Sequence, residues 1–343
     1  MPEMLPPRQY NKSFAPKSPN CKHLRDPRRA DAEPIRRPGG GMCGSRYNFG
    51  GELDVFVSAT LNMPSFPALR ARITTFGNLK GGVGKTTGAI NLACALARGV
   101  TDPETEREAA PPARVLLMDL ESLRTASQHL SVHADRPEQS SGFLFRAPGS
   151  DTAERIAVMP QRAPNEPIDV IPADPDAIAS ADSSRESEYN FVDNLQTLAD
   201  RYDHIIIDLP GQSQGRVFRS VLIASDGVII PVLPDPTVMQ SMGPFLSAVE
   251  DIRRGANPDL RVDGWLISRA GNRNDIDAEV MQETLQQTSR YHTFQTRIRT
   301  LKAVGRAAGF HCSVFSMADG AEAMRDFRGF ATEWLVRVER TQA

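Results

Sequence analysis

The run that decides the fold is Lys80-Gly81-Gly82-Val83-Gly84-Lys85-Thr86-Thr87. It follows a short run rich in β-branched residues at residues 72–77 and leads into a helical pattern at residues 86–98. Glycines allow a tight turn that directs several backbone N–H groups to one point, and the positive end of the following helix strengthens that anion site. The run therefore predicts a phosphate-binding loop between a strand and a helix. The alternative is a glycine-rich turn that binds no ligand.

The polar residues of the loop indicate what it binds. Lys85 supplies a mobile cation for β- and γ-phosphates, and Thr86 offers a hydroxyl to Mg²⁺. We therefore predict that the whole run from Lys80 to Thr87 binds a nucleotide with Mg²⁺.

Aliphatic runs alternate with helical patterns along the rest of the chain. We expect strands at residues 72–77, 114–119, 168–171, 204–208, 227–232 and 264–267, and helices at residues 86–98, 189–199, 238–253 and 319–338. Strands that are apolar on both faces and alternate with helices predict an α/β fold with a three-layer, doubly wound, mostly parallel sheet. Residues 101–113 and 131–167 are expected to be loops.

Residues 1–62 differ from the remainder of the chain. They hold eight of the 26 prolines and ten Lys or Arg against six Asp or Glu. Such a composition does not bury enough apolar surface to offset chain entropy, so we interpret it as a disordered extension or as sequence upstream of a start at Met63. A basic arm that touches DNA is the alternative. The folded domain is expected to span residues 63–343.

The overall composition is that of an ordinary globular protein. The chain has 343 residues, a net charge of −2 and 40% hydrophobic residues. The four cysteines, at positions 21, 43, 94 and 312, form no C-x-x-C pair, which argues against a zinc site or a disulfide framework. No apolar run approaches the roughly 18 residues of a membrane-spanning helix. We therefore expect a cytoplasmic protein.

The phosphate loop departs from the standard pattern in one place. A standard loop has a glycine five positions before its last glycine, where this chain has Leu79, and Lys80 follows it. The run resembles the deviant Walker A motif of the ParA/MinD class of ATPases, and the resemblance covers most of residues 72–338. It implies ATP as the nucleotide, a P-loop ATPase fold, and a homodimer in which Lys80 contacts phosphates bound to the other subunit.

The resemblance also implies a metal and water side to the site. Asp208 ends an aliphatic run and resembles the Walker B aspartate, which would hold Mg²⁺ through water together with Thr86. Asp119 and Glu121 stand where the family usually has Asp-x-Asp, and both are candidate catalytic residues along with Lys80 and Lys85. A glutamate places its carboxylate one methylene further out, and a misplacement of about 1 Å can cost on the order of 10²-fold in rate. We expect slow, partner-stimulated hydrolysis; nucleotide binding without hydrolysis is the alternative.

A basic segment near the C-terminus is the candidate DNA surface. No acidic residue occurs between Glu283 and Asp319. The candidate contacts are Arg290, Arg297, Arg299, Lys302 and Arg306. Such a stretch concentrates positive potential, and in ParA proteins the corresponding region grips the phosphate backbone. We predict nonspecific binding of double-stranded DNA; a solvated basic face is the alternative.

The resemblance is closest to plasmid and chromosome partition ATPases. It implies a nucleoid-associated protein that is stimulated by a ParB-like partner and released from DNA on hydrolysis. The alternatives are a MinD-like switch that positions a protein assembly or acts at a membrane, an ATP-dependent ligase, and a conjugation-accessory ATPase. We expect no stable membrane association, because the apolar stripe of the last helix is better explained by core packing. Cys94 in the first helix and Cys312 in an expected late strand are poorly placed for the shared cluster of the nitrogenase iron-protein relatives.

Overall fold

An eight-stranded sheet organises the residues that the computed structural model describes, which are 71–147, 158–184, 186–211, 215–235, 242–271 and 275–340. The strand order is β10-β9-β8-β1-β7-β4-β6-β5, and all neighbours are parallel except the antiparallel pair β5 and β6. This confirms the predicted mostly parallel, doubly wound α/β sheet. The predicted extension at residues 1–62, and the expected domain start at residue 63, lie outside the described residues.

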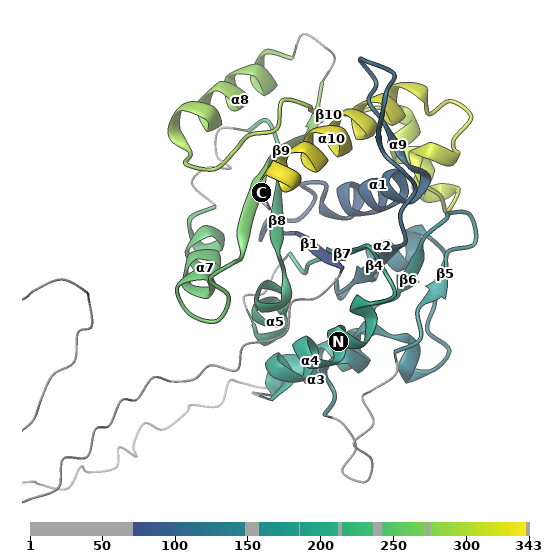
Figure 1. Ribbon diagram of the computed structural model, residues 1–343, viewed down its shortest axis with the longest axis vertical. Helices are drawn as coiled ribbons and strands as arrows, with labels where there is room; N and C mark the ends of the chain where they lie inside the picture. The colour runs from purple at the N-terminus through teal and green to yellow at the C-terminus, as the bar shows by residue number, and fades with distance from the viewer. Residues whose placement is uncertain are drawn as a thin grey trace, which may run out of the picture. The chain divides into compact units, whose positions relative to one another are not determined.

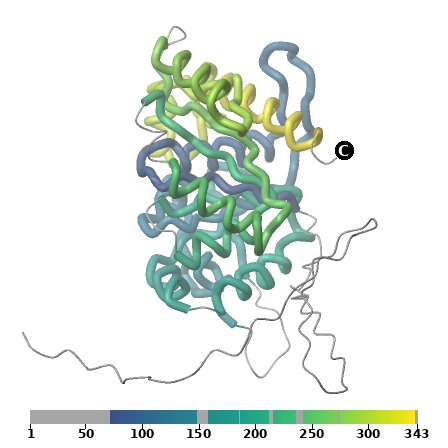
Figure 2. Tube along the Cα trace, turned by 90° about the vertical axis from the view of Figure 1, so that its left-hand side faces the viewer, coloured from purple at the N-terminus to yellow at the C-terminus, as the bar shows by residue number. Residues whose placement is uncertain are grey.

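The strands coincide with the expected aliphatic runs, and two short edge strands are added. Their bounds are β1 Arg72–Phe76, β4 Val115–Asp119, β5 Gln161–Arg162, β6 Asp169–Ile171, β7 His204–Asp208, β8 Gly227–Val232, β9 Arg261–Ala270 and β10 Ile298–Arg299. Figure 1 shows the green strands β8 and β9 on one side of β1 and the teal strands β6 and β5 on the other, and in Figure 2 the green-to-yellow C-terminal part of the chain lies mainly above the teal part.

Helices cover both faces of the sheet. On one face α1 (Lys85–Arg98) and α10 (Ala321–Arg340) pack against side chains such as Ile206 of β7. On the other face α4 (Ser187–Ala199), α5 (Arg216–Ala224) and α7 (Gly243–Arg254) pack against Ile205 and Ile207. Successive residues of one strand thus face opposite layers, as the strand period of two requires. The strand is apolar on both faces because both are buried.

The last helix packs into the core as expected. Its apolar stripe, all of it buried, consists of Phe327, Phe330, Ala331, Trp334, Leu335 and Val338. The ring of Phe330 meets Phe76 of β1 edge-on at 6.4 Å and Phe294 at 5.0 Å. Among the described residues, no helix has both the length and the apolar character that a membrane span requires.

Several expectations from the sequence need correction. Residues 101–113 are not a plain loop, because β2 (Val100–Thr101) and β3 (Glu108–Ala110) form an antiparallel hairpin there. The described part of residues 131–167 contains β5 and the 3₁₀ turns Pro137–Gln139 and Ser141–Phe145. Phe145 stacks on Phe191 of α4 at 4.7 Å, so this segment contributes to the core although its prolines and glycines suggested a loop.

Five helices of the described chain were also missed by the sequence patterns. They are α2 (Thr125–His129), α3 (Pro175–Ser183), α5, α8 (Ile276–Thr288) and α9 (Lys302–Gly309). Cys312 is not in a strand: it lies buried in the turn between α9 and the 3₁₀ turn Val314–Ser316. The helix expected from residue 238 begins at Gly243, and residues 236–241 lie outside the described residues.

Candidate nucleotide site

Strand register places the predicted site residues at one edge of the sheet. Asp208 at the end of β7 pairs in register with Phe76 at the end of β1 and with Asp119 at the end of β4. The predicted phosphate loop follows β1 directly and leads into α1. Because parallel strands end at the same edge, residues from three separate chain segments meet there, which is where ligands bind in open α/β sheets.

The loop has the backbone that its glycines allow. Gly82 has φ 72° and Gly84 has φ 90°, both in the left-handed region that favours glycine. Gly84 immediately precedes Lys85, the first residue of α1, so the unpaired N–H groups of the first helical turn open at the loop. Asn78 fixes the start of the loop: its amide Nδ2 donates to the carbonyl of Pro231, and its Oδ1 accepts from the N–H of Lys80. Sequence reasoning missed Asn78, whose only signal is a polar residue directly after an apolar strand.

Lys85 is buried between the phosphate loop and the loop after β7. Its Nζ donates to the carbonyl of Lys80 at 3.3 Å, and a methyl group at Gly211 would lie 2.6 Å from that Nζ. Burial lowers the pKa of the Lys85 ammonium, while the carboxylates of Asp208 and Glu121 act to raise it. A buried ammonium at the first residue of α1, beside the N–H groups of the loop, is placed to bind an anionic ligand.

Thr86 and Asp208 form the part of the site that can hold a metal ion. The Thr86 hydroxyl donates to Oδ2 of Asp208 at 2.6 Å. The other oxygen, Oδ1, is buried and has no hydrogen-bond partner among the described residues. Burial, together with the charge of Asp119, raises the pKa of Asp208 to about 8, while Thr86 and Lys85 act to lower it. A hydroxyl and a buried carboxylate with an unpartnered oxygen match the oxygen donors that Mg²⁺ prefers.

Both carboxylate oxygens of Asp119 accept hydrogen bonds from the segment that follows β4, including α2. Its Oδ1 accepts from the N–H of Glu121 at 2.9 Å, and its Oδ2 accepts from both the N–H and the hydroxyl of Ser127, at 2.8 and 2.6 Å. The geometry makes Asp119 a residue that positions the loop after β4, and its predicted catalytic role stays a prediction. Ser127 was missed because only the fold brings it to Asp119.

Glu121 connects the loop after β4 to the loop after β7. Its Oε2 accepts from the N–H of Gly211 at 3.1 Å, on the same glycine that lies against Lys85. Although a glutamate is longer than the aspartate usual at this position, the carboxylate of Glu121 thus lies at Gly211, next to Lys85. Lys80 lies at the rim, where its Nζ is 3.4 Å from Oδ2 of Asp235 and both side chains are more than a third exposed.

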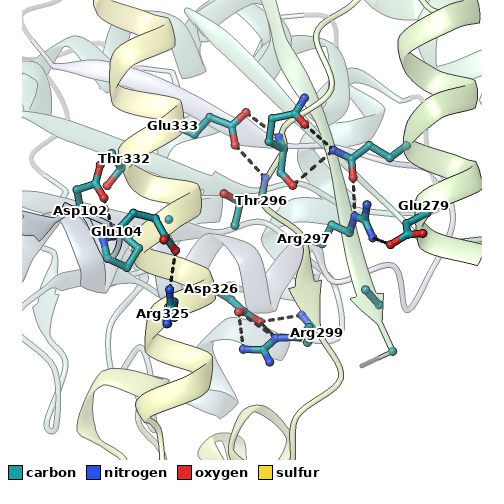
Figure 3. A pocket seen from close by; sticks show the side chains of 16 residues that line it. Asp102, Glu104, Glu279, Thr296, Arg297, Arg299, Arg325, Asp326, Thr332 and Glu333 are labelled. Carbon is teal, nitrogen blue, oxygen red and sulfur yellow. Dashed lines mark hydrogen bonds and ion pairs between the residues drawn. The ribbon is translucent and has the colours of Figure 1, made fainter. Parts of the chain in front are cut away.

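The predicted DNA contacts are mostly paired with acids from other segments. Arg299 pairs with Asp326 of α10 at 2.8 Å and is largely buried, and Arg297 lies 3.8 Å from Glu279 of α8. Figure 3 shows these two arginines in a polar cavity of about 870 Å³, together with the pair Arg325–Glu104.

The other cations of this segment are more exposed. Arg290 pairs with Glu250 at 2.9 Å and Arg306 with Asp319 at 2.6 Å, while Lys302 is exposed at the start of α9. These ion pairs offset part of the positive charge of the segment, because a segment that is acid-free in sequence is not acid-free in space. Contact with DNA by these residues stays a prediction.

Known proteins similar to this chain share its fold and part of its sequence. Residues 71–262 match a family model described as AAA domain (AAA_31). The chain is 32% identical over 215 residues to the chromosome partitioning protein ParA of Myxococcus xanthus, which covers 62% of this chain and 70% of that protein. It is 28% identical over 273 residues to the chromosome-partitioning ATPase Soj of Thermus thermophilus, covering 79% of this chain and 99% of that protein.

A solved structure shows the same fold at lower identity. It is cobyrinic acid a,c-diamide synthase from Mycobacterium smegmatis with bound ATP analog and magnesium, with a TM-score of 0.60 and 24% identity. The similarity covers 80% of this chain and 97% of that one.

Proposed function

The chain belongs to the ParA-type AAA-domain family of P-loop ATPases, and we therefore propose that it is an ATP-hydrolysing partition ATPase that segregates a plasmid or chromosome. The observation that carries the proposal is the contact of Thr86 with Asp208 beside the buried ammonium of Lys85. This arrangement offers a cation to phosphates and an oxygen pair to Mg²⁺ in one place. The relatives named for chromosome partitioning supply the biological role.

The residues of the site would have separate roles toward the phosphates, the metal ion and the loop after β4. The N–H groups of the loop and of the first turn of α1 would bind the phosphates, and Lys85 would neutralise part of their charge. Thr86, and Asp208 through water, would hold Mg²⁺, which when bound neutralises charge on the β- and γ-phosphates. Asp119 would fix the loop that carries Glu121.

Glu121 is the proposed partner of the attacking water. Its carboxylate lies at Gly211, beside Lys85, but one of its oxygens already accepts from the Gly211 N–H. Its other oxygen, Oε1, lies 3.3 Å from the Ser122 hydroxyl, so an attacking water has to share the carboxylate with these two donors. This supports slow hydrolysis that a ParB-like partner accelerates by changing the two loops that Glu121 connects.

Lys80 is the proposed contact between two subunits. The side chains of Lys80 and Asp235 are each more than a third exposed, and such pairs contribute little stability, so the Lys80 ammonium can exchange the carboxylate for a phosphate at small cost. ATP bound by two facing subunits would then favour the dimer by mass action. Sedimentation velocity with Mg·ATP should show a dimer for wild type and a monomer for Lys80→Ala. Dimers of equal strength in both would contradict the role of Lys80.

DNA binding is proposed for the exposed members of the basic segment, which are Arg290, Lys302 and Arg306. Arg297 and Arg299 are assigned to the protein's own ion pairs. Arg162 gives a matched control: like Arg290 it is an exposed arginine paired with a carboxylate, and it lies on β5 at the opposite end of the sheet. Loss of one phosphate contact should reduce the slope of log affinity against log salt by about 0.9.

The experiment is electrophoretic mobility of nonspecific duplex DNA with ATP, ADP and no nucleotide. Wild type should retard DNA with ATP alone, Lys85→Ala should not, and Arg290→Ala should bind less tightly than Arg162→Ala. Nucleotide binding without any retention of DNA would refute the partition role and favour a switch that positions a protein assembly.

A further inference from the structure

The C-terminal end of β9 lies directly against the phosphate loop. The hydroxyl of Ser268 donates to the carbonyl of Val83 at 2.5 Å and is also 3.2 Å from the carbonyl of Val232 in β8. Ser268 is buried, and a methyl group at Gly84 would lie 3.1 Å from its Oγ. The hydroxyl therefore lies behind the loop at the point where Val83 joins Gly84.

This contact fixes the direction of one N–H group of the loop. The carbonyl of Val83 and the N–H of Gly84 belong to the same peptide unit, which is planar and trans, so the two groups point in opposite directions. When Ser268 binds the carbonyl on the β9 side, the Gly84 N–H is turned to the other side. Gly84 has φ 90°, a conformation that glycine adopts without strain, so the backbone permits this orientation of the peptide unit.

The neighbouring residue of β9 acts on the preceding peptide unit. Arg269 has φ 55°, in the left-handed region that non-glycine residues rarely adopt, and its Nη1 donates to the carbonyl of Gly82 at 3.4 Å. By the same planar geometry the Val83 N–H points away from β9. Two consecutive N–H groups of the loop are thus turned to the side opposite β9 by donors from its last residues.

We propose that Ser268 is a positioning residue of the nucleotide site, which orients the Gly84 N–H toward the bound phosphates by holding the Val83 carbonyl. The inference rests on the proposed nucleotide binding and adds a residue outside the loop motif to that site. Arg269 supports the same orientation from an exposed position and is the weaker contributor, because its hydrogen bond is longer and open to solvent.

The test compares nucleotide affinity with stability in three variants. Ser268→Ala removes the donor, and Ser268→Thr retains the hydroxyl on a residue that suits a strand. Ser187→Ala is the matched control, because Ser187 is also buried and its hydroxyl also donates to two carbonyls, those of Ala181 and Ser184, at the start of α4. Isothermal titration with ATP and with ADP, both with Mg²⁺, gives Kd, and thermal unfolding without nucleotide gives Tm.

We expect Ser268→Ala to weaken ATP and ADP about equally, by roughly tenfold, since one hydrogen bond to a charged phosphate loses its alignment. Ser268→Thr should stay within about threefold of wild type, and Ser187→Ala should lower Tm without changing either Kd. Should Ser268→Ala fail to fold, Ser268→Cys fills the same space with a weaker donor and should also lose affinity.

Two results would contradict the positioning role of Ser268, and only the second would also contradict the proposed function. Wild-type Kd values for Ser268→Ala, or for Ser268→Cys where the alanine variant does not fold, overturn the positioning role and leave the proposed function standing. A wild-type protein that binds neither ATP nor ADP overturns both.

Discussion

Gly211→Ala tests whether the buried ammonium of Lys85 is fixed by the loop after β7. The added methyl group would lie 2.6 Å from Lys85 Nζ, whereas ordinary contacts begin near 3.4 Å. The two groups must therefore separate by close to 1 Å. The far end of a lysine side chain moves more readily than backbone, so the displacement falls on the ammonium and the fold is retained. The backbone N–H that donates to Glu121 is unchanged by this substitution.

A displacement of about 1 Å at a group that positions phosphates costs on the order of 10²-fold in rate. We therefore expect kcat/KM for ATP hydrolysis, measured by phosphate release, to fall by about 10²-fold in Gly211→Ala. Gly243→Ala is the control, because a methyl group there meets no atom of the described chain within 4 Å, and its rate should equal that of wild type. Turnover of Gly211→Ala within threefold of wild type, with normal thermal unfolding, would refute the inferred contact between Gly211 and Lys85.

Three further predictions concern the metal, the pH dependence and the core. Thr86→Val, which removes the hydroxyl that donates to Asp208, should weaken Mg·ATP by about tenfold or more and leave metal-free ADP binding unchanged; an equal loss with and without Mg²⁺ would contradict it. Burial lowers the pKa of His204 to about 4, so the neutral form is favoured in the fold. The unfolding free energy is therefore highest above pH 6.5 and falls by roughly 3 kcal/mol as the pH drops to 4, because the unfolded chain binds the proton more readily than the folded one. His204→Gln should remove this fall from the plot of unfolding free energy against pH, measured with denaturant. A fall of equal size in the variant would contradict the prediction. Phe330→Ala, which removes a fully buried ring, should lower the unfolding free energy by about 3–5 kcal/mol, and a loss below 1 kcal/mol would contradict the packing of α10.

The sequence alone determined the phosphate loop, the parallel strands and the carboxylates at their ends. These features are local: the loop is a run of eight consecutive residues after a strand, and the central strands β4, β7 and β8 are nearly continuous apolar runs because both of their faces are buried. Asp119 and Asp208 could be named because each ends such a run, and parallel strands end at one edge.

Tertiary structure alone decided which partners these residues have. Ser127 binds Asp119, and Ser268 binds the loop carbonyl of Val83 from 185 positions away in the sequence. Arg299 meets Asp326 because the last helix packs beside the sheet edge, which cancels charge that appears unopposed along the chain. Hydrogen bonds and electrostatic potential depend on distances in space. Distances between residues that are remote in sequence are set by the order of the strands and the packing of the helices, so the sequence pattern does not give them.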